Sequence, residues 1–145
     1  MKNILIIFLA FLFSCKTNTR KSEPIAFRVA QNYFVKNTQT VNIPAEKVIT
    51  SKEQFDEIFG TAAHMGKNGM PTAIDFSREQ VIAILLPVTN TSTEISPVKL
   101  INTDSDKAEF YYKIKSAEKL SYGIKPSLLL IISKEYKMIH FNKEN

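Results

Sequence analysis

Two histidines are the only imidazoles in this 145-residue sequence, and they are the first side chains to consider for acid–base or metal chemistry. His64 lies in "GTAAHMGKNGM", which we predict to be a loop between a helix and a strand, and His140 lies in a predicted strand. Imidazoles act as general bases and as zinc ligands. Two histidines in separate elements also fit unrelated surface positions. Because side chains alternate along a strand, His140 should face away from Ile139 and Phe141.

A cluster of acidic residues, Asp104, Asp106 and Glu109, occurs in the stretch "NTDSDKAE". Closely spaced oxygen ligands are typical of calcium-binding loops, but the glycine that such a loop needs for its sharp turn is missing. A polar turn between two strands has the same composition. We therefore predict a hairpin turn here, and no metal or other cofactor.

Motifs of the common enzyme classes are missing from the chain. It contains no G-x-S-x-G, no H-E-x-x-H, no Walker loop and no dinucleotide-binding glycine pattern. The single cysteine has a different predicted role, so no thiol nucleophile remains. From the sequence we predict that the protein is not an enzyme and has no catalytic residue.

The single cysteine, Cys15, follows an N-terminus with three zones. A positive charge at Lys2 precedes an unbroken apolar run at residues 4–13, and Ser14 then provides a small residue. Ten apolar residues suit the core of a signal peptide, whereas a membrane span needs about 20. The ending "LFSC" resembles a bacterial lipobox, which implies cleavage after residue 14 and lipidation of Cys15. An ordinary secretory signal that contains a cysteine is the alternative.

The charge of the chain is concentrated outside its predicted folded part. Lys16, Arg20 and Lys21 lie in the polar segment that follows Cys15, and from Glu23 onward there are 15 basic and 14 acidic residues. This balance, with dispersed basic residues and no tryptophan, argues against nucleic-acid binding. We predict a signal peptide at 1–14, a lipidated flexible tether at 15–24 and a single domain at 25–145.

One short helix is predicted in the N-terminal half, in "VITSKEQFDEIFG". Ser51 and Gln54 form a potential capping box, with Thr50 and Glu53 as an alternative register. The apolar side chains that share one face at helical spacing are Phe55, Ile58 and Phe59, and Gly60 suits the C-terminal stop.

Strand patterns dominate the rest of the chain. Residues 80–87 and 127–133 are continuous apolar runs, typical of strands buried on both faces. Residues 109–115 alternate, with Phe110, Tyr112 and Ile114 on one face. The further candidates are an edge strand at 27–36, a partner for 109–115 at 98–101, and a last strand at 137–142. The predicted fold is a small single α+β domain, mainly an antiparallel β-sheet with one short helix.

Two polar segments are candidate binding loops. "PVTNTSTEISP" (87–97) is bracketed by prolines, and "EKLSYGIKP" (118–126) presents apolar side chains beside a glycine and a proline. Ordinary strand connections would look similar. The candidate partner-binding residues are Thr89, Asn90, Thr91, Glu94, Leu120, Tyr122 and Ile124.

A family resemblance covers roughly residues 48–142. The runs "SKEQFDEIFG", "PTAIDFSREQVIAILLP", "YGIKP" and "SLLLIIS" together resemble the PrcB-like domain of bacterial lipoproteins. The family takes its name from a lipoprotein that associates with a protease complex and stabilises it. A Thr-Gly-Gly-Tyr turn that is common in the family is replaced here by residues 90–94, so its role does not transfer. The Lys-, Asn- and Ile-rich composition also resembles small lipoproteins of Bacteroidota, some of which inhibit proteases.

These observations lead to one functional expectation and one alternative. We expect a non-enzymatic module that is anchored to the membrane through lipid on Cys15 and binds a protein partner, namely a secreted or envelope protease that it inhibits or stabilises. The alternative is a structural or assembly lipoprotein that binds another envelope component such as glycan. In a Gram-negative host, the outer membrane is the expected location, on either its periplasmic or its surface side.

Overall fold

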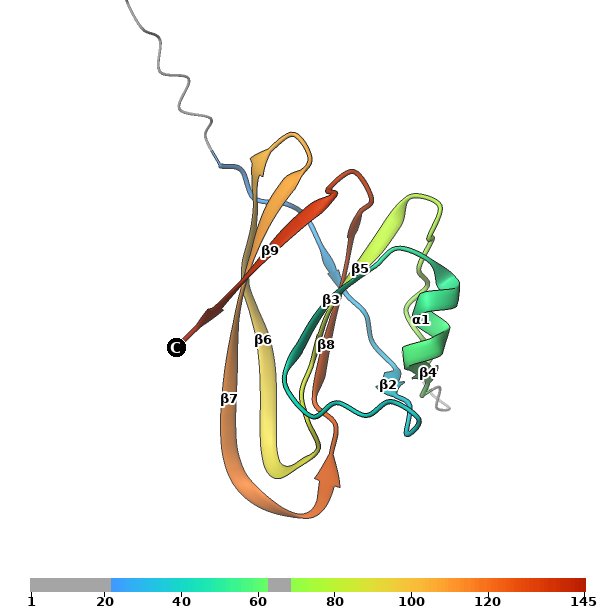
Figure 1. Cartoon of the computed structure of the whole chain (residues 1–145), viewed down its shortest axis with the longest axis vertical. Coiled ribbons are helices and arrows are strands. Elements are labelled where there is room, and N and C mark those ends of the chain that lie inside the picture. Colours follow the sequence, from blue (N-terminus) through green and yellow to red (C-terminus); the bar gives the residue numbers. More distant parts are fainter. Residues whose placement is uncertain (1–21, 63–68) are drawn as a thin grey trace, which may run out of the picture.

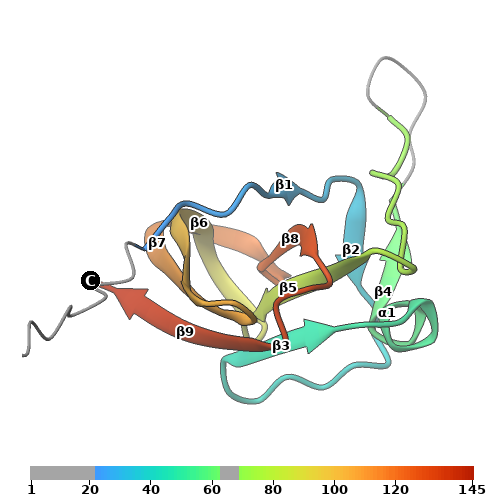
Figure 2. The same cartoon turned by 90° about the horizontal axis from the view of Figure 1, so that it is seen from above.

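The computed structural model describes residues 22–62 and 69–145, and these residues form three layers (Figure 1). A sheet built from a long hairpin and the last strand forms one outer layer. A four-stranded sheet lies in the middle, and the single helix with two short strands forms the other outer layer. The view from above shows the same order of layers (Figure 2).

The central sheet has the strand order β1-β8-β5-β3, and all neighbouring strands are antiparallel. Its strands are β1 (Arg28–Val29), β8 (Ser127–Ser133), β5 (Glu79–Leu85) and β3 (Ala45–Ile49). Ile82 and Ile84 of β5 face one outer layer, whereas Val81 and Ala83 face the other. The prediction that the two apolar runs form strands buried on both faces is confirmed, because each run supplies side chains to two separate cores.

The long hairpin consists of β6 (Thr89–Asp104) and β7 (Lys107–Ile124), joined by a tight turn at Ser105 and Asp106. Pairing of 98–101 with 109–115 across this turn is confirmed, with Leu100 opposite Phe110. The last strand, β9 (Met138–Glu144), runs parallel to β7. The other strand pairs are antiparallel, so the prediction of a mainly antiparallel sheet with one short helix is confirmed for the described residues. The strand β8 belongs to the central sheet and β9 to the outer sheet, so the connection between them passes from one layer to the other. Such a connection allows β9 to run parallel to β7.

The helix α1 (Lys52–Ile58) begins as predicted. Ser51 is its N-cap, and the Ser51 hydroxyl accepts a hydrogen bond from the Gln54 backbone N–H at 3.3 Å. The Gln54 side chain accepts in turn from the Thr50 N–H at 3.1 Å. The predicted apolar face is also confirmed, because Phe55, Ile58 and Phe59 are buried against the central sheet.

Gly60 does not end the helix. The chain leaves α1 at Phe59 in extended conformation and enters β4 (Phe59–Thr61), which pairs with β2 (Tyr33–Val35). Gly60 lies opposite Phe34, and a Cβ atom on Gly60 would stand only 2.6 Å from the Phe34 ring. Glycine therefore allows the Phe34 ring to lie across this position, and the ring, which is 48% exposed, would have to move if Gly60 carried a Cβ atom.

The single edge strand predicted at 27–36 is also wrong, because the chain turns within it. Asn32 has a φ of 62°, a left-handed conformation that asparagine tolerates better than most residues. Its side-chain amide donates to the Met70 carbonyl at 2.9 Å. The turn separates β1, in the central sheet, from β2, in the outer layer.

The start of the described chain is already bound to the domain. The Glu23 N–H donates to the Asn102 side chain at 2.7 Å, and Pro24 forms an isolated bridge with Ile101. Residues 23–24 of the predicted tether therefore lie against β6. In the two described ranges, no helix is both long and apolar enough to cross a membrane.

Candidate functional site

The two segments predicted as binding loops are strands of the long hairpin. Residues 87–97 contain the first half of β6, and residues 118–126 contain the end of β7, so the prediction of loops is wrong. The hydroxyl-rich sequence around Thr91 suggested a loop, but threonine is β-branched and fits a strand well. Pro97 is tolerated because β6 lies at the edge of its sheet. We call residues 89–95 of β6 and 114–124 of β7 the basal ribbon.

The basal ribbon brings the candidate partner-binding residues together in space. Thr89 lies opposite Ile124, and Thr91 lies opposite Lys119, one residue from Leu120. Tyr122 is 62% exposed, whereas Leu120 and Ile124 are half-buried. The candidates on β6 are Thr89 and Thr91, which are half-buried, and Asn90 and Glu94, which are exposed.

Irregular pairing shapes the ribbon near Tyr122. Between the pairs Thr91–Lys119 and Thr89–Ile124, β7 contains three more residues than β6. The Thr89 hydroxyl accepts a hydrogen bond from the Thr91 N–H at 3.1 Å, which supports the β6 backbone locally. Bulges of this kind change the direction in which side chains point. The extra residues of β7 thus present Tyr122 to solvent.

The basal ribbon also has an open backbone edge. The strand β9 pairs with β7 only from Lys107 to Lys113. Beyond Lys113, β7 pairs with β6 alone, within the part of the chain that the structure describes. Open strand edges present backbone N–H and C=O groups that can pair with an added strand. The arrangement can therefore accept an extended segment beside residues 114–124.

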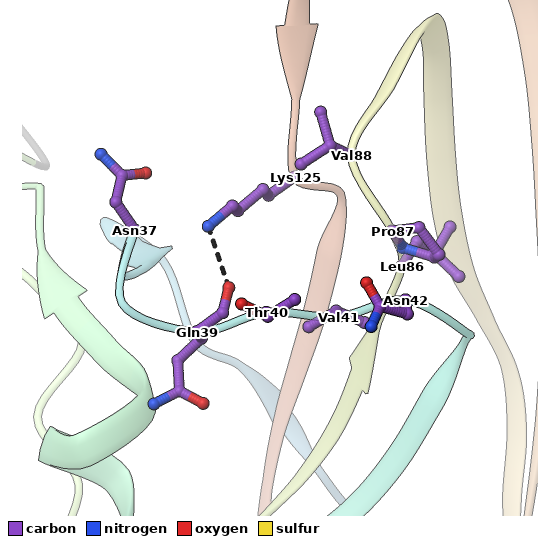
Figure 3. Close-up of a pocket in the computed structure, with 9 residues that line it drawn as sticks. All are labelled: Asn37, Gln39, Thr40, Val41, Asn42, Leu86, Pro87, Val88 and Lys125. Atoms are coloured by element: carbon purple, nitrogen blue, oxygen red, sulfur yellow. Dashed lines mark hydrogen bonds between the residues drawn. The ribbon is translucent and has the colours of Figure 1, made fainter.

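A pocket of about 350 Å³ lies at the foot of the ribbon, where it joins the central sheet (Figure 3). We call it the basal pocket. Its polar wall comes from the segment between β2 and β3, and its apolar wall from the link between β5 and β6. The lining residues are Asn37, Gln39, Thr40, Val41, Asn42, Leu86, Pro87, Val88 and Lys125.

Lys125 is the charged residue of the basal pocket. It follows β7 directly and extends from the ribbon toward the 37–42 segment (Figure 3). Its ammonium donates hydrogen bonds to the backbone carbonyls of Lys36, at 3.0 Å, and Gln39, at 3.1 Å. These two bonds connect the end of β7 to the segment that forms the polar wall.

Sequence reasoning missed the pocket residues of the 37–42 segment. The stretch "NTQTVN" is polar, without glycine or proline, and lies between two predicted apolar elements. That composition marks an exposed connection, but it does not indicate that the connection faces Lys125, more than 80 positions away in the sequence. Pro87 and Lys125 lie within the two segments that the sequence predicts as binding loops, 87–97 and 118–126.

The histidines and acidic residues do not form a common centre in the described residues. His140 is exposed while Ile139 and Phe141 pack against the core, which confirms the predicted orientation. His64 lies outside the described residues. Glu109 accepts a hydrogen bond from the Tyr111 hydroxyl at 2.5 Å, and this bond raises the pKa of that phenol. Within 22–62 and 69–145, no three His, Cys, Asp or Glu side chains are grouped as metal ligands.

The Asp-Phe-Ser stretch that carries most of the family resemblance forms the turn into β5. The Asp75 carboxylate accepts hydrogen bonds from the Ser77 hydroxyl at 2.5 Å and from the Arg78 guanidinium at 2.9 Å. The Ser77 bond, followed by the Arg78 bond, lowers the pKa of Asp75. Glu79 accepts from the Asp75 N–H and from Arg28, so this turn also connects β5 to β1. The motif therefore has a structural use at the end of the sheet where β5 begins.

Comparisons of the chain with known proteins give no relative from which to transfer a function. No protein-family model matches the chain, and no curated protein or solved structure matches it either. The functional conclusions below rest on the sequence and on the geometry of the basal ribbon and basal pocket.

Proposed function

We propose that this protein is a lipid-anchored, non-enzymatic binding module of the cell envelope that engages a protease as an inhibitor or a stabilising subunit. The observation that carries the proposal is the open edge of β7 beside the exposed ring of Tyr122. Proteases bind chains in extended form, and an open strand edge offers matching backbone hydrogen bonds. The resemblance to PrcB-like domains supports the same class of partner.

Tyr122 is the expected anchor of this interface because aromatic residues are enriched among the residues that dominate binding energy. Val88, which is 61% exposed, lies next to Gly123, the residue that follows Tyr122, since its side chain is 3.1 Å from the Cβ position of Gly123. The Tyr122 ring is itself an exposed apolar spot on the ribbon, between the exposed residues Ser121 and Gly123. Such a spot suits a partner that buries a side chain against it.

The test of the interface uses the secreted protease encoded nearest to the gene, assayed on casein with the protein at near-equal molar ratio. We expect cleavage to slow, and Tyr122→Ala to weaken binding by about 5- to 150-fold, that is about 1–3 kcal/mol. Its melting temperature should stay near wild type because the ring is exposed. Leu120→Ala should weaken binding as well, but with some loss of stability, because this side chain is half-buried.

Matched variants make this test specific. Met138→Ala removes an apolar side chain that is 52% exposed at the other end of the hairpin, and it should change neither binding nor stability. Glu94→Ala should mainly change the association rate and its salt dependence. Equal affinities for Tyr122→Ala and wild type would show that the ribbon is not the interface.

Attachment to the membrane is proposed at Cys15, and it has its own test. Cys15→Ser should abolish incorporation of labelled fatty acid and leave uncleaved or mis-cleaved precursor, because the acceptor thiol is gone. Several acyl chains on one residue make a stable anchor, whereas one chain is marginal. Normal labelling of the variant would contradict a lipoprotein.

A second candidate function, glycan binding by an assembly lipoprotein, is favoured by the lining of the basal pocket. The lining contains the amide residues Asn37, Gln39 and Asn42 and an apolar wall of Leu86, Pro87 and Val88, and the Gln39 amide points away from that wall and donates to the Glu57 carbonyl at 3.2 Å (Figure 3). Amides that hydrogen-bond hydroxyl groups, beside an apolar wall, suit a sugar ring. A glycan-binding protein would leave the proteolysis assay unchanged, which separates the two candidates.

A further inference from the structure

The Lys125 ammonium of the basal pocket has hydrogen-bonding capacity and charge that the described residues do not use. An ammonium has three N–H donors. Two of them are directed to the Lys36 and Gln39 carbonyls. Both acceptors are neutral, and within the described ranges no carboxylate lies within ion-pair distance of Lys125. A positive charge and one donor therefore remain at a half-buried position in the pocket wall.

From this arrangement we propose that the basal pocket binds a carboxylate carried by the partner protein, either an acidic side chain or a chain end. The inference rests on the proposed function, since the partner segment that pairs with β7 would pass Lys125 at the end of that strand. Hydrogen bonds between an ammonium and a carboxylate are about twice as strong as neutral ones. The side-chain amide of Asn42 in the lining offers a further donor to the second carboxylate oxygen.

The number of cations in the lining favours a carboxylate over a phosphate. Among the described residues that line the pocket, Lys125 is the one with a cationic side chain. A phosphate monoester carries about 1.5 to 2 negative charges near neutral pH and would remain partly uncompensated here. A carboxylate carries one charge, which Lys125 balances. The apolar wall of Leu86, Pro87 and Val88 can then contact the carbon atoms beside the carboxylate.

Small probes test this inference without the protease. The full chain, labelled with ¹⁵N and held in non-ionic detergent micelles, is titrated with N-acetyl-leucine and with N-acetyl-leucinamide, which differ in the carboxylate alone. We expect saturable shifts of the 37–42, 86–88 and 125 amides with the carboxylate, at a dissociation constant on the order of 1 mM. The amide probe should bind at least about tenfold more weakly, because it cannot neutralise Lys125.

Two variants and one control connect the effect to the pocket. Lys125→Met should reduce carboxylate binding at least about tenfold, and Lys134→Met should not. Lys134 is a fair control because it is also half-buried and donates to a backbone carbonyl, that of Phe76 at 2.9 Å, outside this pocket. If Lys125→Met disturbs the 37–42 segment, the variant Asn37→Asp provides an independent test of carboxylate binding. It keeps Lys125 but places a repelling charge in the lining, so it should also weaken carboxylate binding.

Three results would overturn the inference. They are the absence of saturable shifts, equal binding of the two probes, and unchanged carboxylate binding in both Lys125→Met and Asn37→Asp. Tighter binding of glucuronate than of N-acetyl-leucine at the same amides would assign the pocket to an acidic sugar instead of a protein. These probes do not involve Tyr122, so the two failures can be told apart. Unchanged protease binding in Tyr122→Ala with Lys125-dependent carboxylate binding would mean that the proposed interface fails while the pocket stands. Weakened protease binding in Tyr122→Ala without carboxylate binding would mean that the pocket inference alone fails.

Discussion

Replacing Phe55 with alanine is expected to lower the free energy of unfolding by about 3–5 kcal/mol. Phe55 is 4% exposed, and its ring centroid lies 4.9 Å from those of Tyr33 and Phe59 and 5.7 Å from that of Phe76. These rings come from four different parts of the outer layer, so one truncation removes contacts that hold them together. The loss is a large share of the roughly 5–15 kcal/mol that stabilises a typical domain.

The helix makes this position especially sensitive. A helix as short as α1 is not stable alone in water, so its stability comes from the face that it buries. Urea midpoints of Phe55→Ala and Lys52→Ala provide the measurement. Lys52 lies on the exposed side of the same helix, where it pairs with Asp56, and its removal should leave the midpoint near wild type. Equal midpoints for the two variants would mean that α1 does not pack through Phe55.

Strong apolar patterns are the part of the fold that the sequence allows one to predict. The run at 127–133 coincides with β8, and the run at 80–87 contains most of β5. A strand that is buried on both faces is apolar at nearly every position, so it is easy to recognise in the sequence. The start of the helix could also be predicted, because it depends on local residues. Ser51 and Gln54 satisfy backbone groups locally, without help from distant residues.

Structural features that depend on contacts between residues far apart in the sequence could not be predicted. The 89–95 part of β6 is polar because it lies on an exposed ribbon, so neither alternation nor apolar runs marked it as a strand. The parallel direction of β9 depends on how the chain crosses between layers, which no local residue specifies. The turn at Asn32 depends partly on its bond to Met70, far along the chain.

The candidate site shows the same division. Tyr122 and Thr89 belong to segments whose composition predicts loops. That prediction is wrong, but the two segments do lie side by side. The basal pocket does not follow from the sequence because its wall at 37–42 meets Lys125 through a contact between residues more than 80 positions apart. The composition of the two segments located the region of interest, and the pairing of β6 with β7 defines its geometry.

Phe110→Ala should also cost about 3–5 kcal/mol, in the core on the other side of the central sheet. Phe110 is 0% exposed, stacks on Tyr112 with a centroid distance of 5.7 Å, and meets the Phe141 ring edge-on at 6.2 Å. Since Phe141 belongs to β9, the truncation should loosen this last strand in addition to lowering global stability. The matched control is Lys113→Ala, on the opposite face of the same strand, whose nearest acidic partner is Glu144 at 3.8 Å.

Denaturant unfolding and amide hydrogen exchange together decide this prediction. In Phe110→Ala the β9 amides should exchange faster than the global loss of stability alone requires, because the contact between Phe110 and Phe141 helps to pack β9 onto the core, together with Ile139. Lys113→Ala should leave the midpoint near wild type and affect exchange only around Glu144. A midpoint for Phe110→Ala equal to that of Lys113→Ala would mean that the hairpin does not pack on the central sheet through this ring. Unchanged protection of β9 with a lowered midpoint would instead show that β9 is held by its pairing with β7 and not by the Phe141 contact.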